Sequence, residues 1–556
     1  ALFQKPVKVL GDPDFIGTAA NPTAFATVGP NWVDGRELNA PTGVAVDTSV
    51  SPPILYIADS GNNRVLAYRY ATQLTAGAPA DIIIGQVDRV SNQAQNPANG
   101  GRQTGLNNPT GLAVDKNGNL YVADTGNNRI LRFPQPFSAA NASEFPDFVI
   151  GQQTLSTSTA NLNGLGASTL SISKSGGGRT GLAFDLLGHL WVADTGNNRA
   201  LRFPAGELAA GTKFAPADMV IGQAAFDTNV AGTSRTVLST LRAPNGITVS
   251  SAGILYITDQ FSRVLVFPAQ ATGATATAML GTDPSTPVDA SSLSLPTGVA
   301  AAAGVVYVAD SSDNRVLAFT SPQTSSTASA VIGQSTFTDI KVNLGAGDAS
   351  ASSLHTPDDL AASADELFVA DTGNNRVLVF GVTKTGPGSS ATRVVGQLDF
   401  PFTGVNLVDA KGFSFANAFP AGAVIDSSST PAHLYVPDTF NNRILGYSDF
   451  THLKNGQPAD IVIGQPDFSR SIINFPYGDT SKPNSVGLYQ PTSLAVDSAG
   501  NLYVTDTGND RVLRFPAPFA SGKTAREAAD LVLGQSSFIS SITDATATTL
   551  GTPVSV

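Results

Sequence analysis

The stretch Leu120–Phe133, LYVADTGNNRILRF, decides the fold of this 556-residue chain. It consists of two apolar runs rich in β-forming residues, separated by the turn residues Thr-Gly-Asn-Asn, so it predicts two antiparallel strands joined by a tight turn. Asp124 ends the first run and Arg129 begins the second, which places the two side chains opposite each other. We expect a cross-strand ion pair, or an Asp that accepts turn amides while the Arg braces it.

The motif occurs eight times, and every copy has an Asp before the turn and an Arg after it. The pairs are Asp59/Arg64, Asp124/Arg129, Asp194/Arg199, Asp259/Arg263, Asp310/Arg315, Asp371/Arg376, Asp438/Arg443 and Asp506/Arg511. Gly and Asn tolerate a positive φ, but Ser312 and Phe440 replace the Gly in two copies, so we expect the positive φ at an Asn. The fourth copy, Asp259–Arg263, is one residue shorter and is expected to form a different turn.

Two further strand signals accompany each hairpin. A segment of the type Pro-Thr-Gly-Leu-Ala-Val-Asp precedes it, as at Pro109–Asp115, and an apolar run that ends in Gly-Gln follows it, as at Phe148–Gln152. Charged residues enter this Pro-Thr-Gly signal in two copies: the third has Arg179 in place of the Pro, and the sixth has the doublet Asp358-Asp359. Each copy therefore predicts four strands, and such units in series are the blades of a β-propeller.

We predict an all-β fold, a β-propeller of four-stranded antiparallel blades with eight blades. The alternative is nine blades, one of them incomplete or exchanged. The pattern P-x-G-[LV]-A-V-D followed by L-Y-V-A-D-x-G-N-N-R-[IV] resembles the NHL repeat, and the resemblance covers residues 40–535 in eight copies. It implies a propeller. Because the NHL family is functionally mixed, it leaves the function open.

Both ends of the chain carry surplus strand signals. Val7–Phe15 is similar to the outer-strand signal Ile461–Phe468, and Leu550–Val556 is similar to the start of an inner strand. The first could lie on an edge of its own ring or add to the edge of a neighbouring copy. We divide the chain into residues 1–39, an N-terminal outer strand and leader loop; 40–535, the propeller; and 536–556, a tail with a candidate extra inner strand.

Composition narrows the classes of function. Charged residues make up 13% of the chain and its net charge is −11, which argues against a nucleic-acid partner because such proteins need a positive footprint. The chain has no Cys, which excludes disulfides and Cys-based zinc sites, and no apolar stretch approaches the length of a membrane span.

The expected location is extracellular or at the cell surface. The sequence begins at Ala1 without a signal peptide, as a processed, exported chain would, although a trimmed chain would look the same. Asn141 begins the single N-glycosylation sequon, so it is a candidate glycan site, and a chance triplet is the alternative.

Candidate catalytic and metal-binding residues are few. The four His residues are His189, His355, His433 and His452, and we expect them in separate loops. They would then supply neither a base for a Ser or Thr nucleophile nor a zinc site. The amidating lyase for peptidyl-glycine resembles this fold and holds zinc through several His, and nothing in this sequence matches such a set.

The motif Asp residues superficially resemble a calcium loop, but each has its own Arg and no copy has the twelfth-position Glu of an EF-hand. A second candidate is a ring of polar residues at the starts of the inner strands, which could line one mouth of the channel and hold water or a cation. These residues are Thr42, Thr110, Thr180, Asn245, Thr297, Asp358 and Thr492. The alternative is that they only cap the strand starts.

The sequence therefore predicts a non-catalytic extracellular interaction or structural scaffold without a cofactor. Its expected partners are proteins or copies of itself, with a glycan as a further candidate, and exchange of a terminal strand would produce self-assembly. The alternative function is a propeller enzyme with a metal in its channel, resembling lyases or lactonases. A nucleic-acid-binding NHL module is disfavoured by the acidic balance.

Overall fold

The computed structural model describes fourteen segments of the chain: residues 33, 35–89, 91–95, 104–138, 145–172, 179–282, 287–383, 386–405, 408–411, 413–414, 422–454, 457–520, 527–542 and 546–556. These residues form eight antiparallel sheets, each with four blade strands in chain order from the inside outward. The predicted four-stranded blades and their number are thereby confirmed.

The strands of the first four blades are β1 (Pro41–Asp47), β2 (Ile54–Asp59), β3 (Arg64–Tyr68), β4 (Ile82–Ile84); β5 (Pro109–Val114), β6 (Leu120–Asp124), β7 (Arg129–Phe133), β8 (Phe148–Ile150); β9 (Leu182–Phe184), β10 (Leu190–Asp194), β11 (Arg199–Phe203), β12 (Met219–Ile221); β13 (Ile247–Val249), β14 (Leu255–Asp259), β15 (Arg263–Phe267) and β16 (Ala278–Leu280). A single short α-helix of the described chain, α1 (Ala205–Ala210), follows β11.

The strands of the last four blades are β17 (Pro296–Ala302), β18 (Val305–Asp310), β19 (Arg315–Phe319), β20 (Ala330–Ile332); β21 (Pro357–Ala362), β22 (Glu366–Asp371), β23 (Arg376–Thr383), β25 (Arg393–Val395); β26 (Val424–Asp426), β27 (His433–Asp438), β28 (Arg443–Tyr447), β29 (Ile461–Ile463); β30 (Pro491–Val496), β31 (Leu502–Asp506), β32 (Arg511–Phe515) and β33 (Leu531–Leu533). The sixth sheet has an additional two-residue strand, β24 (Gly386–Pro387), paired with β23.

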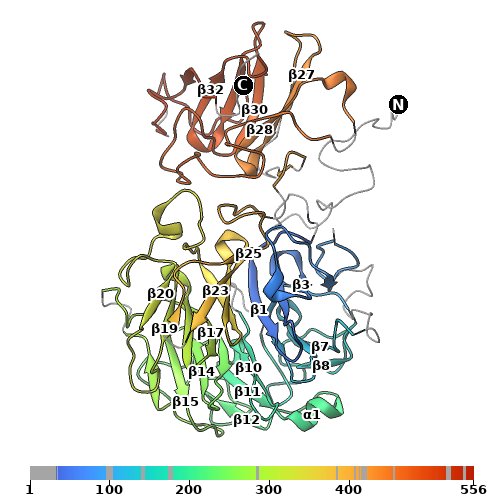
Figure 1. Ribbon diagram of the computed structural model, residues 1–556, viewed down its shortest axis with the longest axis vertical. Coiled ribbons are helices and arrows are strands. Elements are labelled where there is room, and N and C mark those ends of the chain that lie inside the picture. Colours follow the sequence, from blue (N-terminus) through green and yellow to red (C-terminus); the bar gives the residue numbers. More distant parts are fainter. Residues whose placement is uncertain are drawn as a thin grey trace. The chain divides into compact units, whose positions relative to one another are not determined.

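The blades belong to two units. The six-blade unit, Asp34–Gly345 with Ser350–Phe400, holds the first six, and the two-blade unit, Pro401–Val556 with Ala346–Ala349, holds the last two. Inside the six-blade unit each inner strand packs beside the next, and β1 contacts both β5 and β21. Figure 1 shows the blue strands of the first blade beside the yellow strands of the sixth. The first six blades therefore close a ring among themselves.

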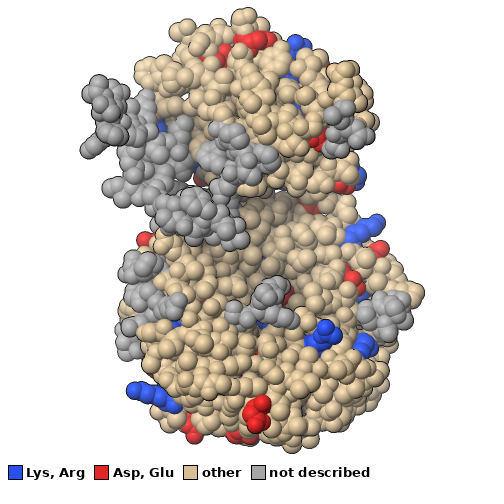
Figure 2. All heavy atoms as spheres, turned by 180° about the vertical axis from the view of Figure 1, so that it is seen from behind, with Lys and Arg blue, Asp and Glu red and all other residues tan. Residues whose placement is uncertain are grey.

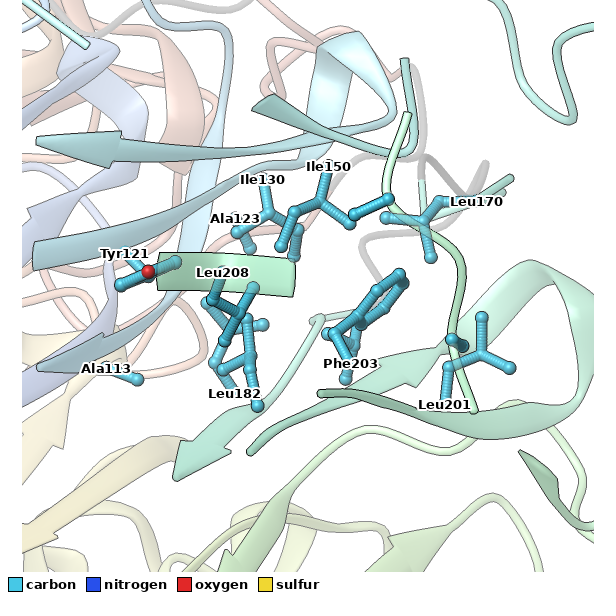
Figure 3. Close-up of a cluster of buried hydrophobic side chains, with 14 of the residues drawn as sticks. Ala113, Tyr121, Ala123, Ile130, Ile150, Leu170, Leu182, Leu201, Phe203 and Leu208 are labelled. Atoms are coloured by element: carbon cyan, nitrogen blue, oxygen red, sulfur yellow. The ribbon is translucent and has the colours of Figure 1, made fainter. Parts of the chain in front are cut away.

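Apolar clusters between neighbouring blades form the core. The six-blade unit contains six of them, one for each blade interface, including the interface between the sixth blade and the first. Figure 3 shows the cluster in which Tyr121 and Ile150 of the second blade face Leu182 and Phe203 of the third. Because every blade is buried on both faces in this ring, its strands are apolar on both faces.

The hairpin turns agree with the expectation from sequence. Seven of the eight contain a 3-10 turn, and the residue after it has a positive φ: Asn63, Asn128, Asn198, Asn314, Asn375, Asn442 and Asp510. The positive φ thus falls on an Asn in six copies and on Asp510 in the eighth. The short fourth turn differs as predicted and has its positive φ at Ser262.

The described surface is sparsely charged. Figure 2 shows Lys, Arg, Asp and Glu side chains scattered over one face rather than gathered into a patch of one sign. Among the described residues, none of the helices has the length and apolar character that crossing a bilayer requires.

Candidate functional site

The eight Asp–Arg pairs are fully buried ion pairs. In each, a guanidinium nitrogen lies 2.6–2.9 Å from a carboxylate oxygen of the motif Asp. In the first blade, Oδ2 of Asp59 accepts hydrogen bonds from Arg64 and from the side chain of Asn62, and Oδ1 accepts one from the backbone of Asn39. The carboxylate therefore fastens the loop that leads into its own blade. In the fourth copy a turn amide is bonded as well, from Phe261 to Asp259.

The Arg and the Gln of the Gly-Gln signal extend this junction. Arg129 donates to the backbone oxygen of Gly105 in the preceding loop, 3.1 Å away. Gln152 donates to the backbone oxygen of Asn128 in the turn and to that of Thr159 in the following loop, both at 2.9 Å. Equivalent bonds recur from blade to blade, for example from Gln465. The long loops between blades are therefore anchored at buried polar junctions.

Burial and ion pairing have opposite effects on the pKa of these carboxyl groups. Burial raises the pKa of Asp124, Asp194 and Asp438, while the paired Arg and the Asn two residues before it favour the ionised form. The fifth blade differs because Asp313 occupies the position of that Asn. Burial raises the pKa of Asp310 to about 7, against the effect of Arg315 and with a further contribution from the Asp313 charge.

The predicted channel-mouth residues lie at the starts of the inner strands in six blades of the ring, except Thr492, which belongs to the two-blade unit. Several of their hydroxyls bond within the same blade: Thr42 with Ser60 at 2.5 Å, Thr110 with Thr125 at 2.6 Å and Thr492 with Thr507 at 2.7 Å. These contacts are those of a strand-start cap.

An ion pair crosses the centre of the ring. Arg179, from the third blade, contacts the carboxylate of Asp359 in the sixth, and its guanidinium lies 3.4 Å from the backbone oxygen of Asp358. The third and sixth blades face each other in a ring of six, so the pair spans the axis. Asp359 also accepts a 2.8 Å hydrogen bond from the backbone of Val44 in the first blade, at the seam where the ring closes.

The two acidic groups at this centre are poised to take up protons. Burial raises the pKa of Asp358 and that of Asp359 to about 6, against the opposing charge of Arg179. The hydroxyl of Thr180 and Nε of Arg179 are buried there without a hydrogen-bond partner in the described structure. The geometry of this centre is that of a brace across the ring.

The four His residues lie apart, on the third, sixth and seventh blades. His189 accepts a hydrogen bond from the backbone of Ala205, the His355 ring lies against Gly373, and His452 pairs with Asp449 at 2.7 Å. Among the described residues, His, Asp and Glu side chains do not gather in the groups of three that a metal ion would require. The candidate glycan site Asn141 and the N-terminal strand signal lie outside the described residues.

One of these His residues, His433, lies beside a hydroxyl. Nε2 of His433 lies 3.1 Å from the hydroxyl of Ser429, and its Nδ1 lies 3.4 Å from the buried carboxylate of Asp426, so a base does stand beside a hydroxyl. The Ser429 hydroxyl donates to the backbone oxygen of Pro431 at 3.0 Å, within the same turn. His433 also packs on Phe519. The group therefore holds the β26–β27 turn against the eighth blade.

Two adjoining hollows open where the inner strands turn into the second strands. The larger, about 560 Å³, lies between the second and third blades and is lined by Tyr121, Phe184 and Leu208, with carboxylates at its edge. The smaller, about 360 Å³, lies between the first and second blades. Asn117 lines both. Sequence reasoning missed them because their walls come from different blades.

Comparison with known proteins identifies the repeat. Residues 106–133 and 488–515 match the NHL repeat family. The chain contains NHL repeats. The two matched NHL repeats hold the inner strands and hairpins of the second and eighth blades, and no curated protein sequence matches the chain.

Several solved structures are similar to this chain at low identity. Virginiamycin B lyase from Staphylococcus aureus is 12% identical over 60% of this chain and 93% of its own, with a TM-score of 0.33. Aldose sugar dehydrogenase from Streptomyces coelicolor is 16% identical over 67% and 98%, with a TM-score of 0.35, and hydrazine synthase from Kuenenia stuttgartiensis is 10% identical over 65% and 99%, with a TM-score of 0.38. At these values the likeness concerns the fold alone.

Proposed function

We propose that this chain is a non-catalytic interaction scaffold that works outside the cell and binds a protein partner between its second and third blades. The observation that carries the proposal is the pair of adjoining hollows, because concave sites with apolar walls and a few polar groups are where proteins take ligands. The motif ion pairs contribute by fixing the blades that form the walls. Rigid blades and anchored loops are suited to holding a partner in one geometry.

The chemistry of the larger hollow selects the kind of partner. Leu186 and Leu187, in the turn beside it, are 69% and 73% exposed, and paired exposed leucines mark a contact surface. The carboxylates of Asp115 and Asp185 line the hollow. Of the two cations that also line it, Arg132 is already bound by Asp147, which leaves Lys116 as the cation that could offset these carboxylates. An apolar floor with an acidic edge fits a peptide segment that carries apolar side chains next to a basic one.

Selection from a random displayed peptide library tests this proposal. We expect the full chain to enrich peptides in which a Lys or Arg stands beside apolar residues. The double variant Leu186→Ser, Leu187→Ser should weaken the binding of those peptides at least tenfold. Hydrogen exchange of the complex should show protection in β6, β9 and the turn that contains Leu186.

The matched control is Val230→Ser, which changes another exposed apolar side chain on a loop of the same unit and should leave binding unchanged. The proposal fails if no peptide is enriched, or if the enriched peptides bind the double variant as tightly as the original chain. Detection of the native protein in the culture medium or at the cell surface tests the proposed location.

A further inference from the structure

Each blade of the ring has two distinct faces. The following face of the first blade carries Tyr56, Val65 and Ile84 and packs against the second blade, whereas its preceding face carries Leu55 and Leu66 and packs against the sixth. The same two kinds of face meet at all six interfaces of the ring, so both faces of each of these six blades are occupied.

In the part of the chain that the structure describes, the outer end of the following face of the eighth blade is open. Leu533 is 46% exposed at the position of Ile84, whereas its equivalents in the other seven blades are 0–5% exposed: Ile84, Ile150, Ile221, Leu280, Ile332, Val395 and Ile463. Tyr503, at the position of the fully buried Tyr56, is half-buried.

Among the described residues, the preceding face of the seventh blade is open as well. Ile425 is 45% exposed and Leu434 is half-buried, although the seven equivalents of Leu434 are buried: Leu55, Leu120, Leu190, Leu255, Val306, Leu367 and Leu502. The cluster on this side, which includes Leu445 and Tyr447, holds residues of the seventh blade and its adjacent loops only. The two-blade unit thus presents one face of each kind.

The tail shows what the eighth blade's face accepts. A side chain at Gly534 would lie 2.5 Å from Leu550, as one at Gly85 would lie 2.6 Å from Leu106, the residue that leads into the second blade. Thr507 donates to the backbone oxygen of Pro553 at 2.7 Å, as Ser60 donates to that of Pro109 at 2.5 Å. Residues 550–556 therefore occupy the inner end of this face as the start of another blade would, and Leu533 stays exposed at its outer end.

We propose that the outer end of the following face of the eighth blade, where Leu533 is exposed, packs in one molecule against the preceding face of the seventh blade in a second copy of this chain. A blade is the partner that this type of face binds at every interface of the chain, and the six ring blades are already used. The two open faces lie on opposite sides of one unit, because the seventh and eighth blades pack together through their other faces. The contact is head-to-tail, so it builds a closed ring or an open filament.

This inference does not rest on the proposed peptide site. Its test uses the full chain with Leu533→Asp on one open face or Ile425→Asp on the other, and follows molecular mass by light scattering and assemblies by electron microscopy. We expect the unmodified chain to associate with rising concentration, and each variant alone to remain monomeric. An equimolar mixture of the two variants should form dimers and stop there, because it contains one intact face of each kind.

The control is Val230→Asp, an apolar position in the ring unit that is more exposed than either Leu533 or Ile425, and this variant should associate like the unmodified chain. A monomeric unmodified chain would overturn the proposal, since the faces would then be covered within one molecule. Assembly that survives both variants, or a mixture of the variants that stays monomeric, would also refute it. Circular dichroism of each variant separates loss of contact from loss of fold.

Discussion

Replacing Asp313 with Asn should stabilise the protein, and more so at pH 8 than at pH 5. In the repeat, the Asn at this position donates to the motif carboxylate, as Asn62 does to Asp59 at 2.8 Å. In the fifth blade a second carboxylate, that of Asp313, takes the place of this donor; it is buried and lies 3.4 Å from Arg315. Two carboxyl groups then share one guanidinium, and they compete for a proton.

The sign and size follow from the pKa of Asp310, which burial raises from 3.8 to about 7 with the help of Asp313. Below about pH 4 the Asp310 carboxyl group is protonated in both the folded and the unfolded state, so its raised pKa does not change the free energy of unfolding. Between pH 4 and 7 the unfolded chain ionises first, and the free energy of unfolding falls as pH rises. A difference of about 3 pKa units corresponds to about 4 kcal/mol above pH 7, which is an upper bound because part of it is burial that the Asn leaves in place.

We expect Asp313→Asn to raise the free energy of unfolding by about 2 kcal/mol at pH 8, because the new Asn donates to a charged acceptor. The increase should be much smaller at pH 5. For a unit of this size that is roughly a 3 °C rise in Tm, which calorimetry at both pH values measures. The reverse change in the first blade, Asn62→Asp, is the matched control and should lower Tm at pH 8. An equal shift at both pH values, or no shift, would refute the argument that two carboxylates compete.

Three further changes test the packing of the ring. Arg179→Met should cost about 3–5 kcal/mol, because Asp359 would be left buried without its cation, and adding Asp359→Gly, the residue that the other five blades of the ring have, should recover part of the loss in Tm. Gly111→Ala should lower Tm by several degrees because a Cβ there would collide with the backbone oxygen of Thr180, whereas Gly166→Ala, with open space around it, should not. Arg129→Met should lower Tm and expose the loop before Gly105 to protease cleavage, which mass spectrometry of the fragments would show.

Local structure was predictable because it repeats. Each hairpin contains its strands, its turn and its ion pair within about fifteen residues, and eight copies leave little room for a different assignment. The positive φ at Asn could be placed because Ser312 and Phe440 exclude the Gly. The structure adds the reason for the Gly: a side chain at Gly61 or Gly126 would meet the Asn that leads into the blade. That contact joins residues about twenty positions apart, and no local pattern shows it.

The size of the ring was not predictable from the repeats, because every blade carries the same two kinds of face and each face accepts any blade. Whether the chain closes after six blades or eight depends on long-range packing. One signal was available. The two copies with a charged residue in the Pro-Thr-Gly signal supply Arg179 and Asp359, and these residues meet at the ring centre. The opposite charges of these two copies could have suggested, from the sequence alone, that the third and sixth blades are in contact.

The Arg179–Asp359 pair explains how a chain of similar blades can favour one number of blades in its closed ring. An Arg from the third blade reaches a carboxylate in the sixth across the axis only when the two blades stand opposite each other. The sixth blade is three blade positions after the third, and three positions are half a turn in a ring of six. In a ring of eight, three blade positions are less than half a turn, and the central channel is wider, so the two side chains would not face each other across the axis. Asp359 also bonds Val44 at the seam. A single carboxylate thus joins the blade opposite and the blade that must come next, which favours closure at six and leaves the remaining two blades with open faces.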